Sequence, residues 1–226
     1  MIFRWMAILA ALWSPAIAVW AQSGINDILA GKLLNPKVGQ WAWYDVTDGD
    51  RKYVLRQAVV GEERVGSQTG HWVELELVPE VGYPTVYKML LTGPANDPQH
   101  LKKLYVREGN NPIQEPPLRQ ETPSQSNPPA KHARIGVEDV QTLGGSVRAE
   151  HVRWEKNGQK SDLWTSEKVP PCGIIRMQSP SGTMILRNYG TGGPYAKSVM
   201  DEAATSAPPA TSSGRTSPPT KVEIKP

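Results

Sequence analysis

Alternation of apolar and polar residues with a period of two runs through much of this 226-residue chain. In segment 71–78, Val73, Leu75 and Leu77 share one face, while Glu74 and Glu76 point to the other. This period is typical of an antiparallel sheet with one face toward water. Such patterns predict nine strands, over residues 41–46, 53–60, 71–78, 85–91, 101–107, 147–155, 162–166, 173–178 and 183–189.

Turn residues separate several of these segments. Asp48-Gly49-Asp50 follows the first strand, and Asn157-Gly158 lies between the strands at 147–155 and 162–166. Glycine supplies the positive φ that tight hairpins need. Consecutive strands joined this closely predict a mainly β fold, a meander forming a single strongly curved antiparallel sheet.

One helix is expected before the first strand. Ile25, Ile28, Leu29 and Leu33 recur at helical spacing, and Pro36 prevents the helix from continuing. We expect this N-terminal helix to pack against the sheet.

The first 21 residues have the pattern of a cleavable signal peptide. Arg4 precedes an apolar run over residues 5–13, Pro15 interrupts it, and cleavage fits after Ala18 or Ala21. A membrane anchor is the alternative, but the apolar run is shorter than the roughly 20 residues of a membrane span. We therefore expect an exported protein, in the periplasm or outside the cell, without a membrane span after cleavage. Since no cysteine lies near either cleavage site, we do not expect lipid attachment there.

The rest of the chain is predicted to form one β-rich domain, residues 22–196, followed by a tail. Residues 110–134 are rich in proline, and residues 197–226 are mostly Ala, Ser, Thr and Pro. Neither stretch has the apolar surface needed to offset its ordering entropy. We predict a mobile loop at 110–134, either a binding loop or a passive linker, and a disordered tail at 197–226.

Charge and cysteine content bear on two properties of the protein, nucleic-acid binding and disulfide formation. The chain has 25 Lys and Arg against 22 Asp and Glu, without a dense basic run, so a nucleic-acid partner is not expected. Cys172 is the only cysteine, which excludes an intrachain disulfide. We interpret it as a small packing residue, although pairing with another chain stays open.

Catalytic motifs do not appear in the sequence. It has no nucleophile elbow, no glycine-rich phosphate loop and no metal-spaced His or Cys cluster. Glu74 and Glu76 could act as paired carboxylates, but solvated surface glutamates are much more common. We therefore expect no enzymatic activity, no catalytic residues, no bound metal and no cofactor.

Aromatic residues and methionines recur along the predicted strands. Aromatic side chains favour half-buried pleated surfaces, so an ordinary sheet core is one interpretation. The other is the lining of a hydrophobic cavity left by a curved sheet. The candidate cavity residues are Trp41, Trp43, Tyr53, Trp72, Tyr87, Met89, Trp154, Trp164 and Met177.

Residues 140–190 carry a family resemblance. Gly145-Ser146-Val147 is followed by Trp164-Thr165-Ser166-Glu167-Lys168-Val169-Pro170 and by Gly173-Ile174-Ile175-Arg176-Met177. This order resembles that of uncharacterised bacterial exported proteins whose fold is similar to the LolA/LolB lipoprotein-carrier superfamily. The resemblance implies an antiparallel half-barrel around a hydrophobic cavity for acyl chains, and it implies no catalytic residues.

Two functions follow from these patterns. The first is a soluble exported carrier or sensor of a lipid or other apolar small molecule. The second is a structural module of the cell envelope with a filled core, whose loop and tail bind a protein partner through extended proline-rich segments. A cavity in the structure would favour the first function.

Overall fold

The computed structural model describes residues 33–94, 97–118, 131–156 and 158–202. The described helices are short: η1 (Pro98–His100), η2 (Pro194–Ala196) and α2 (Val199–Glu202). All other described elements are strands: β1 (Gln40–Asp48), β2 (Arg51–Val65), β3 (Gln68–Pro79), β4 (Thr85–Leu91), β5 (Leu101–Glu108), β6 (Lys131–Thr142), β7 (Gly145–Lys156), β8 (Gln159–Thr165), β9 (Ile174–Ser179) and β10 (Gly182–Thr191).

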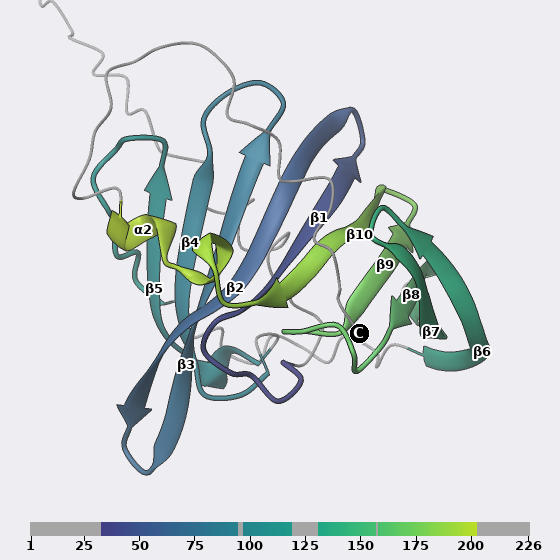
Figure 1. Ribbon diagram of the computed structural model, residues 1–226, viewed down its shortest axis with the longest axis horizontal. Coiled ribbons are helices and arrows are strands. Elements are labelled where there is room, and N and C mark those ends of the chain that lie inside the picture. The colour runs from purple at the N-terminus through teal and green to yellow at the C-terminus, as the bar shows by residue number, and fades with distance from the viewer. Residues whose placement is uncertain (1–32, 95–96, 119–130, 157, 203–226) are drawn as a thin grey trace, which may run out of the picture.

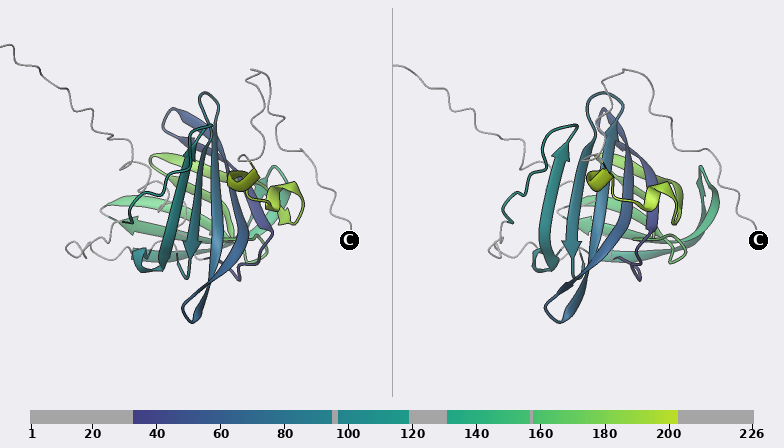
Figure 2. Two further views of the ribbon diagram at one scale, coloured as in Figure 1. Left: turned by 90° about the vertical axis from the view of Figure 1, so that its left-hand side faces the viewer. Right: turned by 60° about the vertical axis from the view of Figure 1, so that its left-hand side comes forward.

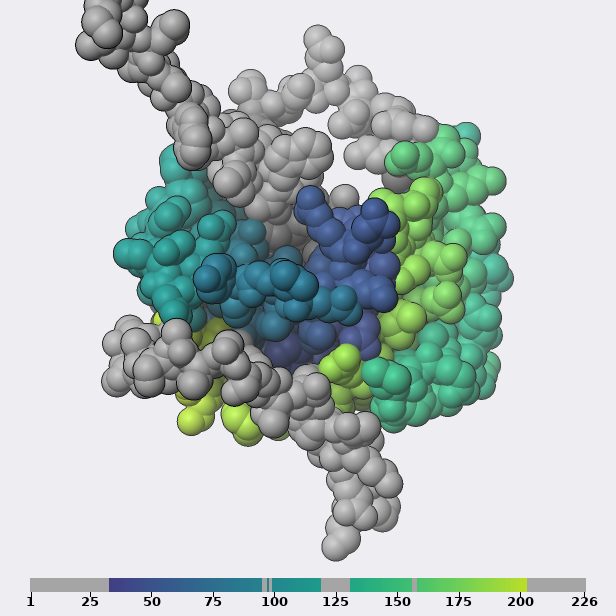
Figure 3. Space-filling model, turned by 90° about the horizontal axis from the view of Figure 1, so that it is seen from above, coloured from purple at the N-terminus to yellow at the C-terminus, as the bar shows by residue number. Residues whose placement is uncertain are grey.

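Ten strands form one antiparallel sheet in the order β5-β4-β3-β2-β1-β10-β9-β8-β7-β6 (Figure 1). Two five-stranded meanders are therefore joined where β1 pairs with β10. The sheet is not closed, and β5 and β6 are its edges. Because β6 also approaches β9 and β10, which are not its neighbours in the sheet, the second meander curls (Figure 2). Seen from above, β10 lies between the first meander and the rest of the second (Figure 3).

The predicted strands are confirmed, and the β4 bounds agree residue for residue. The two glycine turns are also confirmed, with φ of 57° at Gly49 and 76° at Gly158. Strand β6 was not predicted, and residues 131–134 were expected in the loop. Almost every β6 side chain is exposed, so this edge strand has little apolar alternation to detect.

The expected N-terminal helix is not supported. Residues 23–32 lie outside the described part of the chain, and residues 33–35 are not helical. Instead, the Leu34 backbone N–H donates to the Pro171 carbonyl at 2.8 Å. The predicted signal peptide, loop residues 119–130 and tail residues 203–226 also lie outside the described residues.

Side chains of the first meander divide between two faces. The core face carries the main apolar cluster, in which Leu55, Val73 and Leu75 are fully buried. Trp41, Trp43 and Ala58, on the opposite face, form a second, smaller cluster. Strands β1 and β2 therefore bury apolar residues on both faces, whereas the sequence pattern predicts one polar face.

Cys172 packs in the main apolar cluster, as expected of a packing residue. It is 4% exposed, and its Sγ lies 3.5 Å from the Tyr44 hydroxyl. Burial raises the pKa of the Cys172 thiol, and hydrogen bonds offset this only in part. Burial also raises the pKa of Tyr44.

We expect the raised pKa of Cys172 to make the fold sensitive to alkali. The neutral thiol contributes stability that is fully present below the unfolded pKa, about 8.5, and is lost as pH rises through the higher folded pKa. The melting temperature should therefore fall more between about pH 7 and about pH 10 in the native protein than in Cys172→Ala. An equal fall in both proteins, measured by calorimetry, would contradict this expectation.

Candidate functional site

After β10 the chain returns across the first meander (Figure 1). We call residues 194–202, which include η2 and α2, the C-terminal strap, and the sheet face beneath them the strap face. Arg56 Nη1 donates to the carbonyls of Tyr195 at 2.6 Å and Lys197 at 3.1 Å. Two further contacts come from Arg107, whose Nη1 and Nη2 donate to the carbonyls of Met200 and Val199 at 3.0 and 2.9 Å. Two arginines of the sheet thus hold the strap by its backbone.

Glu74 accepts hydrogen bonds from the strap at the centre of the contact between the strap and the sheet. Its side chain is fully buried and accepts hydrogen bonds from the Ser198 hydroxyl at 2.6 Å and the Val199 backbone N–H at 2.9 Å. It also pairs with Arg56, which bonds Glu76 through Nε at 3.1 Å. Because burying a charge is costly unless it is paired, this network holds the strap in one position.

Aromatic contacts hold the N-terminal end of the strap against the sheet. The Tyr195 ring meets Trp41 and Trp43 edge to face, at centroid distances of 5.1 and 5.7 Å. Trp41 Nε1 also donates to the Gly192 carbonyl at 2.9 Å. Each such aromatic pair typically contributes about 0.5–1.5 kcal/mol beyond its buried area.

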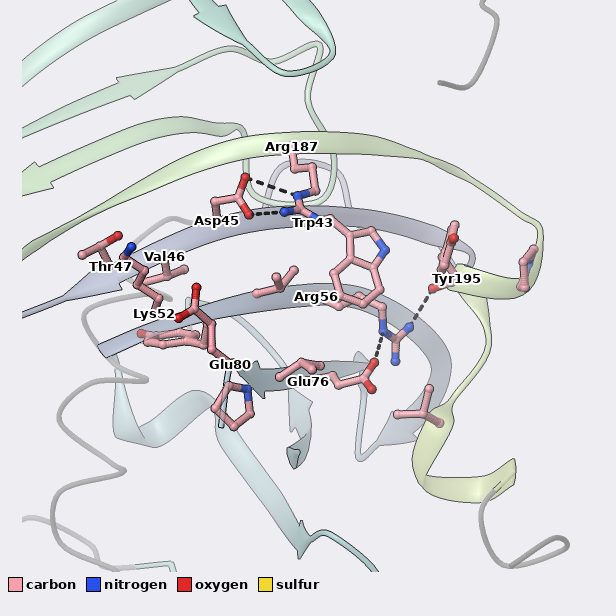
Figure 4. A pocket seen from close by; sticks show the side chains of 16 residues that line it. Trp43, Asp45, Val46, Thr47, Lys52, Arg56, Glu76, Glu80, Arg187 and Tyr195 are labelled. Atoms are coloured by element: carbon pink, nitrogen blue, oxygen red, sulfur yellow. Dashed lines mark hydrogen bonds and ion pairs between the residues drawn. The ribbon is translucent and has the colours of Figure 1, made fainter. Parts of the chain in front are cut away.

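A groove of about 920 Å³ lies between the strap and strands β1–β3 (Figure 4). This volume is at the upper end of the range of about 300–1,000 Å³ for small-molecule sites. The lining residues are Trp43, Asp45, Val46, Thr47, Lys52, Tyr53, Val54, Arg56, Glu76, Val78, Pro79, Glu80, Arg187, Pro194, Tyr195 and Val199. The groove therefore combines apolar and aromatic side chains with six charged ones.

Most of the charges in the groove are already paired. Arg187 and Asp45 form a two-contact ion pair at 2.6 and 3.2 Å, and Arg56 bonds Glu76. Within the described part of the chain, Lys52 and Glu80 form no ion pair. Both are exposed, and the Glu80 backbone N–H donates to the Lys52 carbonyl at 3.2 Å.

Trp43 contributes an unused hydrogen-bond donor. Its side chain lines the groove and is only 8% exposed, but its indole Nε1 has no acceptor among the described residues. A buried donor without a partner costs about 1–3 kcal/mol, so such groups are rare in folded proteins. Because this nitrogen is itself buried, a ligand in the groove would reach it only if neighbouring side chains moved.

The nine candidate cavity residues do not share one cavity. Trp43 and Tyr53 line the groove, and Trp41 packs beside Trp43 beneath the strap. On the core face, Tyr87 and Met89 are buried in the main apolar cluster, and Met177 packs against it. The remaining three, Trp72, Trp154 and Trp164, lie in three separate aromatic contacts.

Those contacts are all with polar or charged neighbours. Trp72 stacks on Tyr105 at 5.7 Å, with the Lys88 and Lys103 ammonium groups 5.6 and 5.7 Å from its ring. Trp154 packs against His132 at 5.0 Å.

Trp164 belongs to a partly buried polar cluster in the second meander. It stacks on His151 at 4.2 Å and donates to Glu138. His151 Nε2 lies 2.8 Å from Asp162 Oδ1, which also accepts from Arg153 Nε at 2.8 Å. Partial burial acts to raise the pKa of Asp162, but the hydrogen bonds from Arg153 and His151 outweigh it and lower that pKa. We interpret this cluster as a structural link between β6, β7 and β8.

The residues that build the strap contact were not predicted from the sequence. Glu74 and Glu76 were expected to be solvated, but they are 0% and 4% exposed because Arg56 and the strap cover them. The predicted tail began at Lys197, whereas residues 197–202 belong to the folded domain. One feature of the sequence could have indicated this contact. Arg56 lies within an apolar strand, and a buried arginine requires a buried partner of opposite charge.

The comparisons with known proteins give only distant structural likenesses. No family model matches the chain, and no curated protein matches it significantly. An inferred lipoprotein of Parabacteroides distasonis aligns over 71% of this chain and 99% of its own, at 11% identity and a TM-score of 0.38. An inferred exported protein with a YmcC-like fold from Bacteroides fragilis aligns over 71% and 100%, at 9% identity and a TM-score of 0.40.

A third neighbour is a DUF1329 family protein of Desulfovibrio piger. It aligns over 79% of this chain and 93% of its own, at 8% identity and a TM-score of 0.30. None of the three is described as a LolA- or LolB-like carrier. Within the described residues, no helix is long and apolar enough to cross a bilayer.

Proposed function

We propose that this protein is an exported, non-enzymatic binding protein that holds a lipid or other apolar small molecule in the strap-face groove. The observation that carries the proposal is the open groove of about 920 Å³ between the strap and the sheet, whose lining includes the aromatic side chains of Trp43, Tyr53 and Tyr195. Small-molecule sites typically combine an apolar wall with few polar groups that orient the ligand. Trp43, Val54, Val78 and Tyr195 supply such a wall.

Three further considerations support the proposal. The signal-peptide pattern over residues 1–21 favours export to the periplasm. The resemblance to lipoprotein carriers favours an acyl ligand, although their cavity is formed by a half-barrel and this groove lies beneath the strap. The groups that could perform acid-base chemistry here, Glu74 and Glu76, are bound to Arg56 and the strap, which favours a structural role.

We expect an apolar fluorescent probe such as anilinonaphthalene sulfonate to bind the purified protein saturably, and added lysophospholipid to displace it. Val54→Glu places a charge in the apolar wall and should weaken probe binding about tenfold or more. The matched control is Val137→Glu on exposed β6, which should bind as the native protein does. Both melting temperatures must stay within a few degrees of native. Equal binding by the two variants would place the site elsewhere and refute the proposal.

A protein-interaction module of the cell envelope is the second candidate. The core face is densely filled, as Leu55, Val73 and Leu75 show. The edge strand β6 also exposes Ile135 and Val137, by 50% and 45%. An open edge of this kind can pair with a strand of another protein.

A further inference from the structure

We propose that the ligand of the groove is a single-chain lipid with a zwitterionic head group, held between Lys52 and Glu80. This inference rests on the proposed binding function and adds the ligand class. The groove is lined by three cationic and three anionic side chains: Lys52, Arg56 and Arg187 against Asp45, Glu76 and Glu80. Equal numbers of both signs disfavour a ligand that carries only one kind of charge.

The paired charges leave one cation and one anion for the ligand. Arg187 is neutralised by Asp45, and Arg56 by Glu76 and Glu74. Lys52 and Glu80 remain, without an ion pair among the described residues. Lys52 and Glu80 lie at one end of the groove, whereas Arg56 and Tyr195 lie at the other (Figure 4).

A purely anionic head at this end would meet Glu80, and a purely cationic head would meet Lys52. A head with a phosphate and an ammonium group can satisfy both side chains, because each of its charges faces the opposite sign. Both side chains are exposed, so the head can stay partly hydrated. The groove therefore selects for a zwitterion by charge complementarity.

The remainder of the groove fits the hydrocarbon chain of such a lipid. Val54, Val78 and Pro79 provide an apolar wall for a hydrocarbon chain. Trp43 packs against Tyr195 at the end of the groove opposite Lys52 and Glu80, where the far end of the chain would lie (Figure 4). One groove of about 920 Å³ matches a single chain, as in a lysophospholipid.

The test uses three amphiphiles of equal chain length, below their micelle concentrations: lysophosphatidylcholine, lysophosphatidylglycerol and an alkyltrimethylammonium salt. Calorimetric titration of the full chain should show lysophosphatidylcholine binding about three- to tenfold more tightly than either of the others. Lys52→Glu should lower that affinity by a similar factor. The double variant Lys52→Glu/Glu80→Lys should recover it, because both charges are again present. Lys102→Glu, on an exposed lysine outside the groove, is the matched control.

Each other outcome is decisive. Equal affinity for the three amphiphiles, or binding of the apolar probe without binding of any of them, would overturn the head-group inference and leave the binding function intact. Tightest binding of the anionic or the cationic amphiphile would also overturn it. No binding of any of the three, together with no binding of the apolar probe, would overturn the proposed function itself.

Discussion

Replacing Glu74 by alanine is expected to lower the free energy of unfolding by about 3–5 kcal/mol, the usual cost of removing one member of a buried ion pair. The substitution leaves Arg56 buried with fewer negative partners. It also removes the acceptor of the Ser198 hydroxyl and of the Val199 and Met200 backbone N–H groups. Buried donors without partners add to the loss.

Urea denaturation of Glu74→Ala and of two comparison variants measures this effect. Glu74→Gln keeps the shape and an acceptor oxygen, so we expect a smaller loss. Glu80→Ala removes an exposed glutamate that has no described ion pair, and its effect should stay within about 0.5 kcal/mol. If Glu74→Ala were as stable as Glu80→Ala, the strap contact would contribute little and its described geometry would be wrong.

Ending the chain at Gly193 is expected to have the second large effect. This truncation removes the whole strap, including Tyr195, which covers Trp41 and Trp43. It also removes backbone acceptors of Arg56 and Arg107 and the donors to Glu74. We expect the melting temperature to fall by roughly 6–12 °C, which corresponds to a loss of about 3 kcal/mol in a domain of this size.

The matched control is a chain that ends at Glu202, which keeps every strap contact described above. Its melting temperature should stay close to that of the full chain. The difference between the two truncations isolates the strap, because both lack residues 203–226. Equal melting temperatures for the two truncations would show that the strap is not part of the cooperative fold. Since the strap forms one wall of the groove, the shorter chain should also lose probe binding.

The strands were predictable because their signal is local. Val73, Leu75 and Leu77 alternate with polar residues, and this period specifies a strand before any neighbour is known. Strand β6 was not predictable in this way because it lies at an edge and its side chains are exposed on both faces. The candidate site was predicted in part: Trp43 and Tyr53 line the groove, whereas Tyr87 and Met89 belong to the core face.

The strap contact shows most clearly where local information ends. Glu74 and Glu76 occupy the positions of a solvent-exposed strand face, and their type alone favours that interpretation. They are buried because Arg56 on the next strand lies opposite Glu76, and because residues 195–200 return from more than 100 positions away in the chain. The composition of residues 197–226, rich in Ala, Ser, Thr and Pro, predicted disorder from Lys197 onward. Residues 197–202 are ordered through their contacts with the sheet, and composition does not reveal those contacts.

The sequence by itself determined the class of fold, the order of nine strands, the packing role of Cys172 and the expectation of export. These features depend on the alternation of neighbouring residues and on the residues at turns, which are close together in the sequence. Only the tertiary structure decided which face each aromatic residue occupies, how the β1–β10 pairing joins the two meanders, and where the groove lies. Those features depend on contacts between residues far apart in the sequence, and sheet register and burial set these contacts only when the whole chain folds.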